Sequence, residues 1–199
     1  MSRLAGALER EGFAVLNFSY PSTKQSIAKS AELLRRAVNE RGAASESKVH
    51  FVTHSLGGIV VRVLVKQQRP ANLGRVVMLS PPNQGSEVAD RLRKFFVYRL
   101  ATGPAGQELG TDAASTPNTL DAVDFPLGVI TGDRSFNPLF SAWIAGPDDG
   151  KVSVRRARVD GMADFLVVPH SHSFIMRSPR VAAQVVHFLR HGKFEQRPA

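Results

Sequence analysis

Short, mainly apolar runs alternate along this chain with longer segments whose apolar residues recur at every third or fourth position. Such alternation predicts strands connected by helices, and therefore a parallel sheet. Because the runs do not alternate between apolar and polar residues, both faces of the sheet should be covered by helices. We therefore predict an α/β fold with a mostly parallel sheet, and its strands are expected at 13–18, 48–52, 76–79, 127–131 and 165–168.

The intervening segments predict the helices. Their apolar stripes place them at 2–11, at 57–68, at 181–190 before Gly192, and from about Ile27 to Gly42. The chain has 199 residues, of which 43% are hydrophobic. This length and composition predict a single domain, residues 1–199, with a substantial core.

Residues 84–125 interrupt the alternation of strands and helices. The segment begins with a predicted amphipathic helix and continues into sequence rich in Gly, Thr and Pro. Insertions between core strands often carry function. Two interpretations remain open: a cap over a functional site, and an ordinary helix on the sheet followed by a surface loop. The apolar residues of the predicted helix are Val88, Leu92, Phe95, Phe96 and Leu100.

Ser55 lies between a predicted strand and a predicted helix, and Gly57 and Gly58 follow it. A sharp turn at this point strains the backbone at its apex and requires small neighbours. The turn exposes the hydroxyl at the carboxyl edge of the sheet, beside a helix N-terminus whose free N–H groups can stabilise an oxyanion. The pattern Thr53-x-Ser55-x-Gly57 is that of a nucleophile elbow, with threonine in place of the first glycine. The alternative is a serine that only caps the helix.

Four motifs follow one another in a fixed order: THSLGG, LSPPNQGS, DDGKVSV and SHSF. Together they resemble the α/β-hydrolase superfamily, in its lipase/esterase-like branch, over nearly the whole chain. The superfamily places a nucleophile, an acid and a histidine in this order. The resemblance implies that Ser55 is the nucleophile, that His172 is its base, and that the backbone N–H of Leu56 is one donor of the oxyanion hole.

Other histidines compete for the role of base. His170 lies two residues nearer the last strand, but His172 matches the superfamily's histidine ahead of the final helix. His54 is not expected to be the base, because the side chains of adjacent residues diverge on such a turn. Ordinary structural roles suffice for the remaining histidines, which are His50, His187 and His191.

Three aspartates are candidates for the acid. Asp149 lies in a DDGKV sequence that resembles the acid loop of many lipases, and it is the first choice. Asp133 follows a predicted strand directly and is the alternative acid, whereas Asp148 is a third choice. Each also has a simpler explanation: Asp-Asp-Gly favours a turn in any case, and Asp133 beside Arg134 fits a salt bridge within a loop.

The chain departs from the superfamily at its start. The second oxyanion donor normally comes from a loop that follows an earlier strand, and both the strand and the loop are missing from this sequence. That strand would lie between those predicted at 13–18 and 48–52. One expectation is that Met1 is an internal methionine and that the natural protein starts about 20–40 residues upstream. The other is that the two flanking strands pair directly, which gives a remodelled sheet and an impaired oxyanion hole.

The leading functional prediction is a serine hydrolase that cleaves carboxylic esters of small molecules or lipids. The apolar helix at 88–100 also allows peripheral contact with a membrane. The alternative is a weak or inactive scaffold that binds a partner or an anionic surface, since the net charge is +9. The basic residues are scattered singly without interleaved aromatic residues, so no nucleic-acid partner is expected.

Composition excludes several kinds of chemistry. The chain has no cysteine, which rules out disulfides and thiol nucleophiles. No histidine and carboxylate set has the spacing of metal ligands, so neither a metal nor a cofactor is expected. The N-terminus does not resemble a signal peptide. As written, the sequence predicts a cytoplasmic protein, or an exported one if its true start lies upstream, and it leaves the oligomeric state open.

Overall fold

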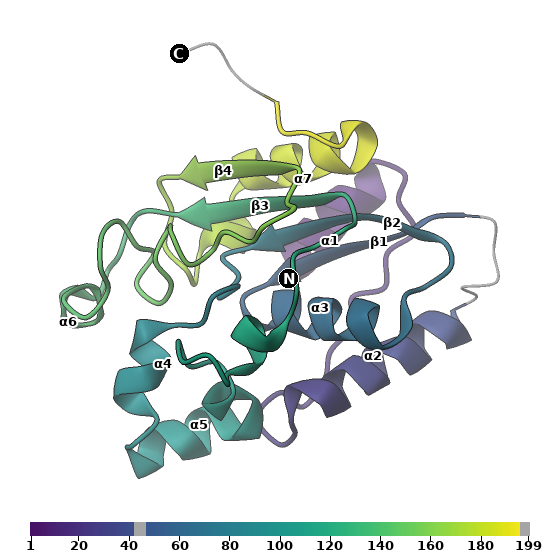
Figure 1. Cartoon of the computed structure of the whole chain (residues 1–199). Helices are drawn as coiled ribbons and strands as arrows, with labels where there is room; N and C mark the ends of the chain where they lie inside the picture. Colours follow the sequence, from purple (N-terminus) through teal and green to yellow (C-terminus); the bar gives the residue numbers. More distant parts are fainter. Residues whose placement is uncertain (42–46, 196–199) are drawn as a thin grey trace.

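The computed structural model describes residues 1–41 and 47–195. Four strands form one parallel sheet in the order β1-β2-β3-β4, which is also their order along the chain (Figure 1). The predicted helix end at Gly42 lies outside the described residues. The strands are β1 (Val49–His54), β2 (Leu73–Leu79), β3 (Leu127–Gly132) and β4 (Asp164–Val168).

Helices cover both faces of this sheet (Figure 1). One face packs against α2 and α3, and the other against α1 and α7. None of the helices in the described ranges is long and apolar enough to cross a bilayer. The four helices are α1 (Ser2–Arg10), α2 (Ile27–Glu40), α3 (Leu56–Gln68) and α7 (Pro179–His191).

Strand β2 explains why the predicted strands are apolar throughout. Val76 and Met78 are buried in the core between the sheet and helices α2 and α3. Val77 and Leu79, one position further along in each case, are buried in the core on the α1 and α7 side. Because successive side chains of a strand point to opposite faces, a central strand covered on both sides must be apolar at every position. The predicted fold class is confirmed.

The stretch at 13–18 is not a strand, contrary to our prediction. The sheet in the described residues ends at β1, and 13–18 makes no ladder with it. An apolar run becomes a strand only where another strand offers N–H and C=O groups alongside. Phe13 and Val15 instead pack against the core on the α1 side as part of an irregular segment. Direct pairing of this stretch with β1, our second expectation, is therefore also wrong.

The free edge of β1 is only partly shielded from solvent. Phe51 is the one buried residue of this strand, and the others are half-buried. The ring of Phe13 packs edge-on against His50, with ring centroids 6.2 Å apart. Because water reaches much of this edge, its unpaired backbone groups need not be counted as buried and unsatisfied.

Residues 84–125 form two helices and a turn rather than the one amphipathic helix that we predicted. Helix α4 (Glu87–Leu92) ends before Phe95, and α5 (Phe96–Gln107) begins after it, followed by the turn η1 (Thr116–Thr119). Only Val88 of the predicted apolar stripe is buried, whereas Phe95, Phe96 and Leu100 are exposed. The stripe fails because these side chains have no surface of the sheet to cover. A capping role for this segment stays a prediction.

Two contacts tie this insertion to the rest of the fold. Gly103 has a φ of 61°, and a Cβ atom there would lie 1.8 Å from the carbonyl oxygen of Thr23, so the close approach of the two backbones requires glycine. The buried guanidinium of Arg62 on α3 donates hydrogen bonds to the backbone carbonyls of Asn83 and Leu120. The two ends of the insertion are thus held against α3.

Candidate active site

Ser55 occupies the turn between β1 and α3 that the sequence predicts as a nucleophile elbow. Its backbone has φ 52° and ψ −125°, a conformation that non-glycine residues rarely adopt. The Ser55 N–H donates to the carbonyl of Leu79 at 2.8 Å, which holds the turn at the end of β2. Ser55 is half-buried, so solvent reaches part of this residue.

The two glycines that follow Ser55 make room for this turn. A Cβ atom on Gly57 would lie 3.3 Å from the Cβ of Thr53, tighter than most such contacts. The absence of a side chain at Gly57 therefore accommodates the threonine that replaces the usual first glycine. A Cβ on Gly58 would meet Met78 and Pro81 at 3.0 and 3.1 Å, so this glycine lets α3 pack closely on β2.

His172 comes from the loop between β4 and α7 and reaches Ser55. Its Nε2 lies 2.9 Å from the Oγ of Ser55, and its Nδ1 lies 2.9 Å from a carboxylate oxygen of Asp149. An ionised Asp149 can only accept, so Nδ1 carries the proton and Nε2 is free to accept the proton of the Ser55 hydroxyl. His172 is only 4% exposed, so water has little access to the ring.

Asp149 is fixed by its own turn, and it also fixes His172. One carboxylate oxygen accepts the backbone N–H groups of Lys151 and Val152, and the other faces His172. In addition, the backbone N–H of His172 donates to the carbonyl of Asp149 at 2.8 Å. Burial by itself would raise the pKa of Asp149, but the hydrogen bonds from His172 and Val152 outweigh it and lower the pKa below the ordinary value. Asp149 is therefore ionised at neutral pH.

The other candidates lie outside this chain of hydrogen bonds. Asp148 accepts from the hydroxyl of Ser141 and the N–H of Gly150, which are contacts within its own loop. Asp133 has an ion-pair contact of 3.7 Å with Arg134. The backbone of His170 packs against Gly132, and in the described residues no hydrogen bond joins its ring to Ser55. The structure thus brings together Ser55, His172 and Asp149 out of the predicted set.

A second histidine contacts this set, and sequence reasoning missed it. The Nε2 of His54 donates to the backbone carbonyl of His172 at 2.8 Å, and the two ring centroids are 4.8 Å apart. Burial, together with the nearby His172, lowers the pKa of His54 to about 3, so its ring is neutral at physiological pH. His54 thus holds the loop that carries His172. The only hint in the sequence was the position of His54 next to Ser55, at the end of β1.

His54 should make the fold sensitive to acid. Its pKa is about 3 in the folded chain, whereas the ordinary value for histidine is 6.5, so below pH 6.5 the unfolded chain binds a proton that the folded chain does not. The contribution of His54 to stability is therefore complete above pH 6.5 and decreases as the pH falls toward 3. Between pH 7 and about pH 4.5 we expect a loss of about 2–3 kcal/mol, measured by urea unfolding.

The variant His54→Gln serves as the control for this effect. A glutamine amide can still donate to the carbonyl of His172 but does not titrate, so the variant should lose less stability over the same pH interval. Other groups that titrate in both proteins cancel in the comparison. Equal losses of stability in the wild type and in His54→Gln would show that protonation of His54 is not the cause of the acid sensitivity.

The candidate site contains no obvious place for a metal. Over residues 1–41 and 47–195, no three histidine, aspartate or glutamate side chains are grouped so that they could hold an ion. The backbone N–H of Leu56 is the first of α3 and has no acceptor within the helix, so it is available to a ligand at the elbow. The arrangement therefore offers a hydroxyl, a base, an acid and a donor for negative charge.

Residues 2–123 match the family described as a domain of unknown function (DUF7379). This match contains Ser55 and the insertion up to Val123, but not Asp149 or His172. The lysosomal thioesterase PPT2 of Bos taurus is 28% identical over 155 residues, which cover 65% of this chain and 50% of that protein. The triacylglycerol lipase of Pseudomonas fragi is 33% identical over 91 residues, covering 46% of this chain and 31% of the lipase.

Solved structures of lipases and esterases share the fold. The phospholipase PlaB from Legionella pneumophila superposes with a TM-score of 0.72 at 19% identity, over 96% of this chain and 56% of that one. The chain therefore has the α/β-hydrolase fold that its motifs predict. It spans about half the length of the thioesterases and of the phospholipase, and about a third of the lipase.

Proposed function

Since the chain belongs to the DUF7379 family and has the α/β-hydrolase fold, we propose that it is a serine hydrolase that cleaves carboxylic esters. One observation carries the proposal: the two hydrogen bonds of 2.9 Å that join Ser55 to His172 and His172 to Asp149. A serine that only caps a helix has no need of a histidine held by a buried carboxylate. In this assignment Ser55 is the nucleophile, His172 the base and Asp149 the acid.

The proposed reaction proceeds in two halves. The Oγ of Ser55 attacks the carbonyl carbon while its proton passes to Nε2 of His172. The tetrahedral intermediate then collapses, and His172 gives the proton to the departing alcohol, which leaves an acyl-enzyme. A water molecule next attacks the acyl group, losing its proton to His172, and the acid product is released as the proton returns to Ser55.

Charge stabilisation in this scheme comes from the backbone and from Asp149. The oxyanion of each tetrahedral intermediate accepts the N–H of Leu56 at the N-terminus of α3, where the helix dipole also favours negative charge. The ionised carboxylate of Asp149 stabilises the positive charge that develops on His172. Because Asp149 is only 1% exposed, water screens this interaction little.

The substrate class is inferred from the relatives. By their names, the proteins similar to this chain act on thioesters, triacylglycerols and phospholipids. These substrates share an acyl carbonyl with a leaving oxygen or sulfur atom, and the same attack by Ser55 serves each of them. We propose acyl esters as the substrates, with acyl thioesters as close competitors for the same site.

Labelling with a fluorophosphonate probe tests the proposal. The probe phosphonylates a serine only if that serine is activated, so the wild type should be labelled, whereas Ser55→Ala should not react and His172→Ala should react very slowly. Ser19→Ala, which removes an exposed serine of the irregular segment after α1, is the matched control and should label like the wild type. Peptide mass spectrometry should place the adduct on Ser55. A folded wild-type chain that does not react would instead support a non-catalytic scaffold.

A further inference from the structure

Residues 91–100, here called the docking segment, carry an unusual number of exposed apolar side chains. They link the end of α4 to the first turns of α5. Large apolar groups exposed close together on a soluble protein mark a surface that binds something. The exposed fractions are 61% for Phe95, 74% for Phe96, 75% for Val97 and 72% for Leu100.

The docking segment is also strongly basic. Four of its ten residues are Arg or Lys, and no acidic residue occurs between Asp90 and Glu108. Arg93 pairs with Asp112. The other three cations are exposed and have no ion pair with any residue in the described part of the chain. They are Arg91, Lys94 and Arg99.

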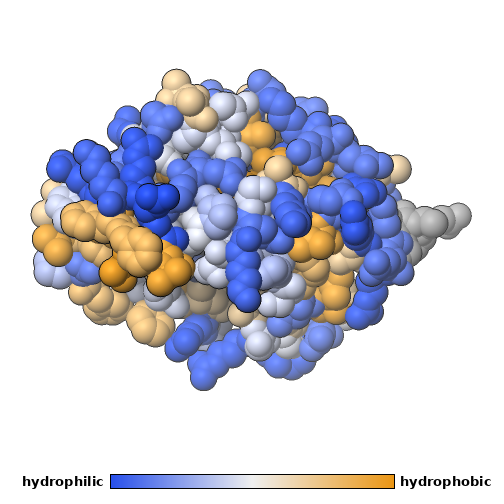
Figure 2. Space-filling view, turned by 90° about the horizontal axis from the view of Figure 1, so that it is seen from below, coloured by the Kyte–Doolittle hydropathy of each residue, from blue (hydrophilic) through white to orange (hydrophobic). Residues whose placement is uncertain are grey.

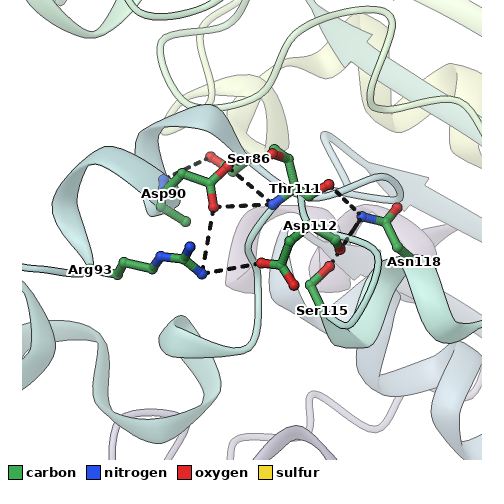
Figure 3. Close-up of polar contacts among 8 residues, drawn as sticks. Ser86, Asp90, Arg93, Thr111, Asp112, Ser115 and Asn118 are labelled. Carbon is green, nitrogen blue, oxygen red and sulfur yellow. Dashed lines mark hydrogen bonds and ion pairs between the residues drawn. The ribbon is translucent and has the colours of Figure 1, made fainter.

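A polar network holds the base of the docking segment in place (Figure 3). Asp90 in α4 accepts hydrogen bonds from the N–H and hydroxyl of Thr111, and Arg93 reaches Asp112 at 3.1 Å. Asn118 in turn donates to the backbone carbonyls of Thr111 and Asp112. The apolar side chains of the segment are therefore presented from an anchored base.

A second group of exposed apolar side chains lies in the loops after β3 and β4. The rings of Phe136 and Phe174 meet edge-on, with centroids 6.1 Å apart, and Leu139 is exposed on α6 (Pro138–Ser141). The guanidinium of Arg177 lies 5.2 Å from the ring centre of Phe174. Because all four strands are parallel, these loops leave the sheet at the same edge as Ser55.

Both apolar groups belong to one end of the molecule. In Figure 1, α4, α5 and α6 lie toward the end at which the arrows of β3 and β4 point. Figure 2, seen from below, shows hydrophobic side chains gathered at the corresponding left end and bordered by hydrophilic ones. The site at Ser55 opens at this same edge of the sheet.

We propose that this end of the protein docks on an anionic phospholipid bilayer, with the docking segment as its principal contact. Aromatic and aliphatic side chains enter the boundary between headgroups and acyl chains, while neighbouring Arg and Lys side chains bind the anionic headgroups. The exposed apolar groups and the three unpaired cations are then satisfied by a single partner.

The charge of the docking segment favours a bilayer over a second copy of the chain as its partner. A symmetric dimer through the docking segment would bring Arg91, Lys94 and Arg99 of one copy close to the same residues of the other. Such like charges repel, and the segment itself offers no carboxylate to compensate for them. An anionic bilayer complements both the charge and the apolar character of the surface.

Docking in this orientation would turn the carboxyl edge of the sheet toward the lipid. An acyl ester of a membrane lipid would then be delivered directly to Ser55. This last step rests on the proposed function, whereas docking itself does not require catalysis. The two can therefore fail separately.

The test measures partition of Ser55→Ala protein onto vesicles, so that no lipid is consumed. Vesicles of phosphatidylcholine mixed with phosphatidylserine should bind it at least about 10-fold more strongly than phosphatidylcholine alone. The triple variant R91Q/K94Q/R99Q should bind the mixed vesicles on the order of 100-fold more weakly. F96S/V97S should also bind on the order of 10-fold more weakly, because less apolar area enters the bilayer.

A matched variant distinguishes vesicle binding through the docking segment from binding through the overall positive charge of the protein. R41Q/K48Q/K193Q removes three exposed cations from the helix ends and loop at the opposite edge of the sheet, and it should bind mixed vesicles within about twofold of the parent. Equal losses in the two triple variants would overturn the proposal, as would equal binding to both kinds of vesicle. A dimer that F96S/V97S converts to a monomer would also overturn it, in favour of a second copy.

The two proposals are distinguished with a soluble short-chain ester. In an otherwise wild-type chain, R91Q/K94Q/R99Q should hydrolyse this ester at the wild-type rate, because none of its three sites contacts Ser55 or His172. Vesicle binding without ester turnover would refute the proposed hydrolase while keeping the docking surface. Turnover without vesicle binding would refute the docking surface alone.

Discussion

Replacement of Ser55 by alanine should reduce ester turnover to near the uncatalysed background, a loss on the order of 10⁴- to 10⁶-fold. The alanine has no oxygen to attack the carbonyl, so the acyl-enzyme cannot form. The fold should be retained, because the hydrogen bond from the backbone N–H of residue 55 to the carbonyl of Leu79 does not involve the side chain. Initial rates with a chromogenic short-chain ester, compared with buffer alone, measure the effect.

His172→Ala should show a loss of similar size. When the groups of such a relay act as a unit, removing one member costs about as much as removing several. The double variant Ser55→Ala/His172→Ala should therefore be no slower than either single variant. Losses that multiply in the double variant would show that the two residues act independently, which contradicts the proposed relay.

Replacement of Asp149 by asparagine should lower turnover on the order of 10³- to 10⁴-fold with little change in the fold. The asparagine oxygen can still accept from Lys151 and Val152, and the backbone bond from His172 to residue 149 remains. Its amide group, however, donates toward Nδ1 of His172, which moves the ring proton to Nε2. His172 then cannot accept the proton of Ser55. Steady-state kinetics and thermal unfolding together separate this effect from a loss of structure.

Asp133→Asn is the matched control for Asp149→Asn. Both aspartates follow β3 along the chain, but Asp133 contacts Arg134 rather than the base. We expect the Asp133 variant to retain turnover within a few-fold of the wild type, because a charge of this kind in a loop contributes little. A larger loss in Asp133→Asn than in Asp149→Asn would transfer the role of acid to Asp133.

The features that depend on local pattern were predictable from the sequence. The strands β1 to β4 lie within a few residues of their expected positions, because each is an apolar run that has a strand beside it to pair with and helices over both faces of the sheet. The turn at Ser55 follows from the glycines behind it, which permit a backbone that larger residues would block.

The features that depend on distant partners were not predictable. Phe13 and Val15 look like part of a strand, but a strand also needs an edge to pair with, and no local pattern reports that edge. The apolar residues from Phe95 to Leu100 recur at helical spacing, yet within the described residues nothing covers Phe95, Phe96 or Leu100. Periodicity shows which side chains share one face of a helix, but not what that face contacts.

In the candidate site, too, local features were predictable from the sequence and long-range contacts were not. Sequence order singled out Ser55 and favoured His172 among two histidines and Asp149 among three aspartates, without excluding the others. Which histidine and which aspartate approach Ser55 depends on how the loops after β3 and β4 meet, and in particular on the backbone hydrogen bond from His172 to Asp149. The contact of His54 with His172 joins residues 118 positions apart, and no spacing rule connects them.

The backbone at Ser55 carries a thermodynamic cost. A non-glycine residue in such a sparsely populated conformation is destabilised by about 1–3 kcal/mol relative to a relaxed one. Glycine would relieve most of that strain at once, so a chain shaped for stability alone would have no hydroxyl at this turn. The folded state of this protein is therefore less stable than its own backbone allows, and part of the difference is held as distortion at the residue that carries the hydroxyl of the elbow.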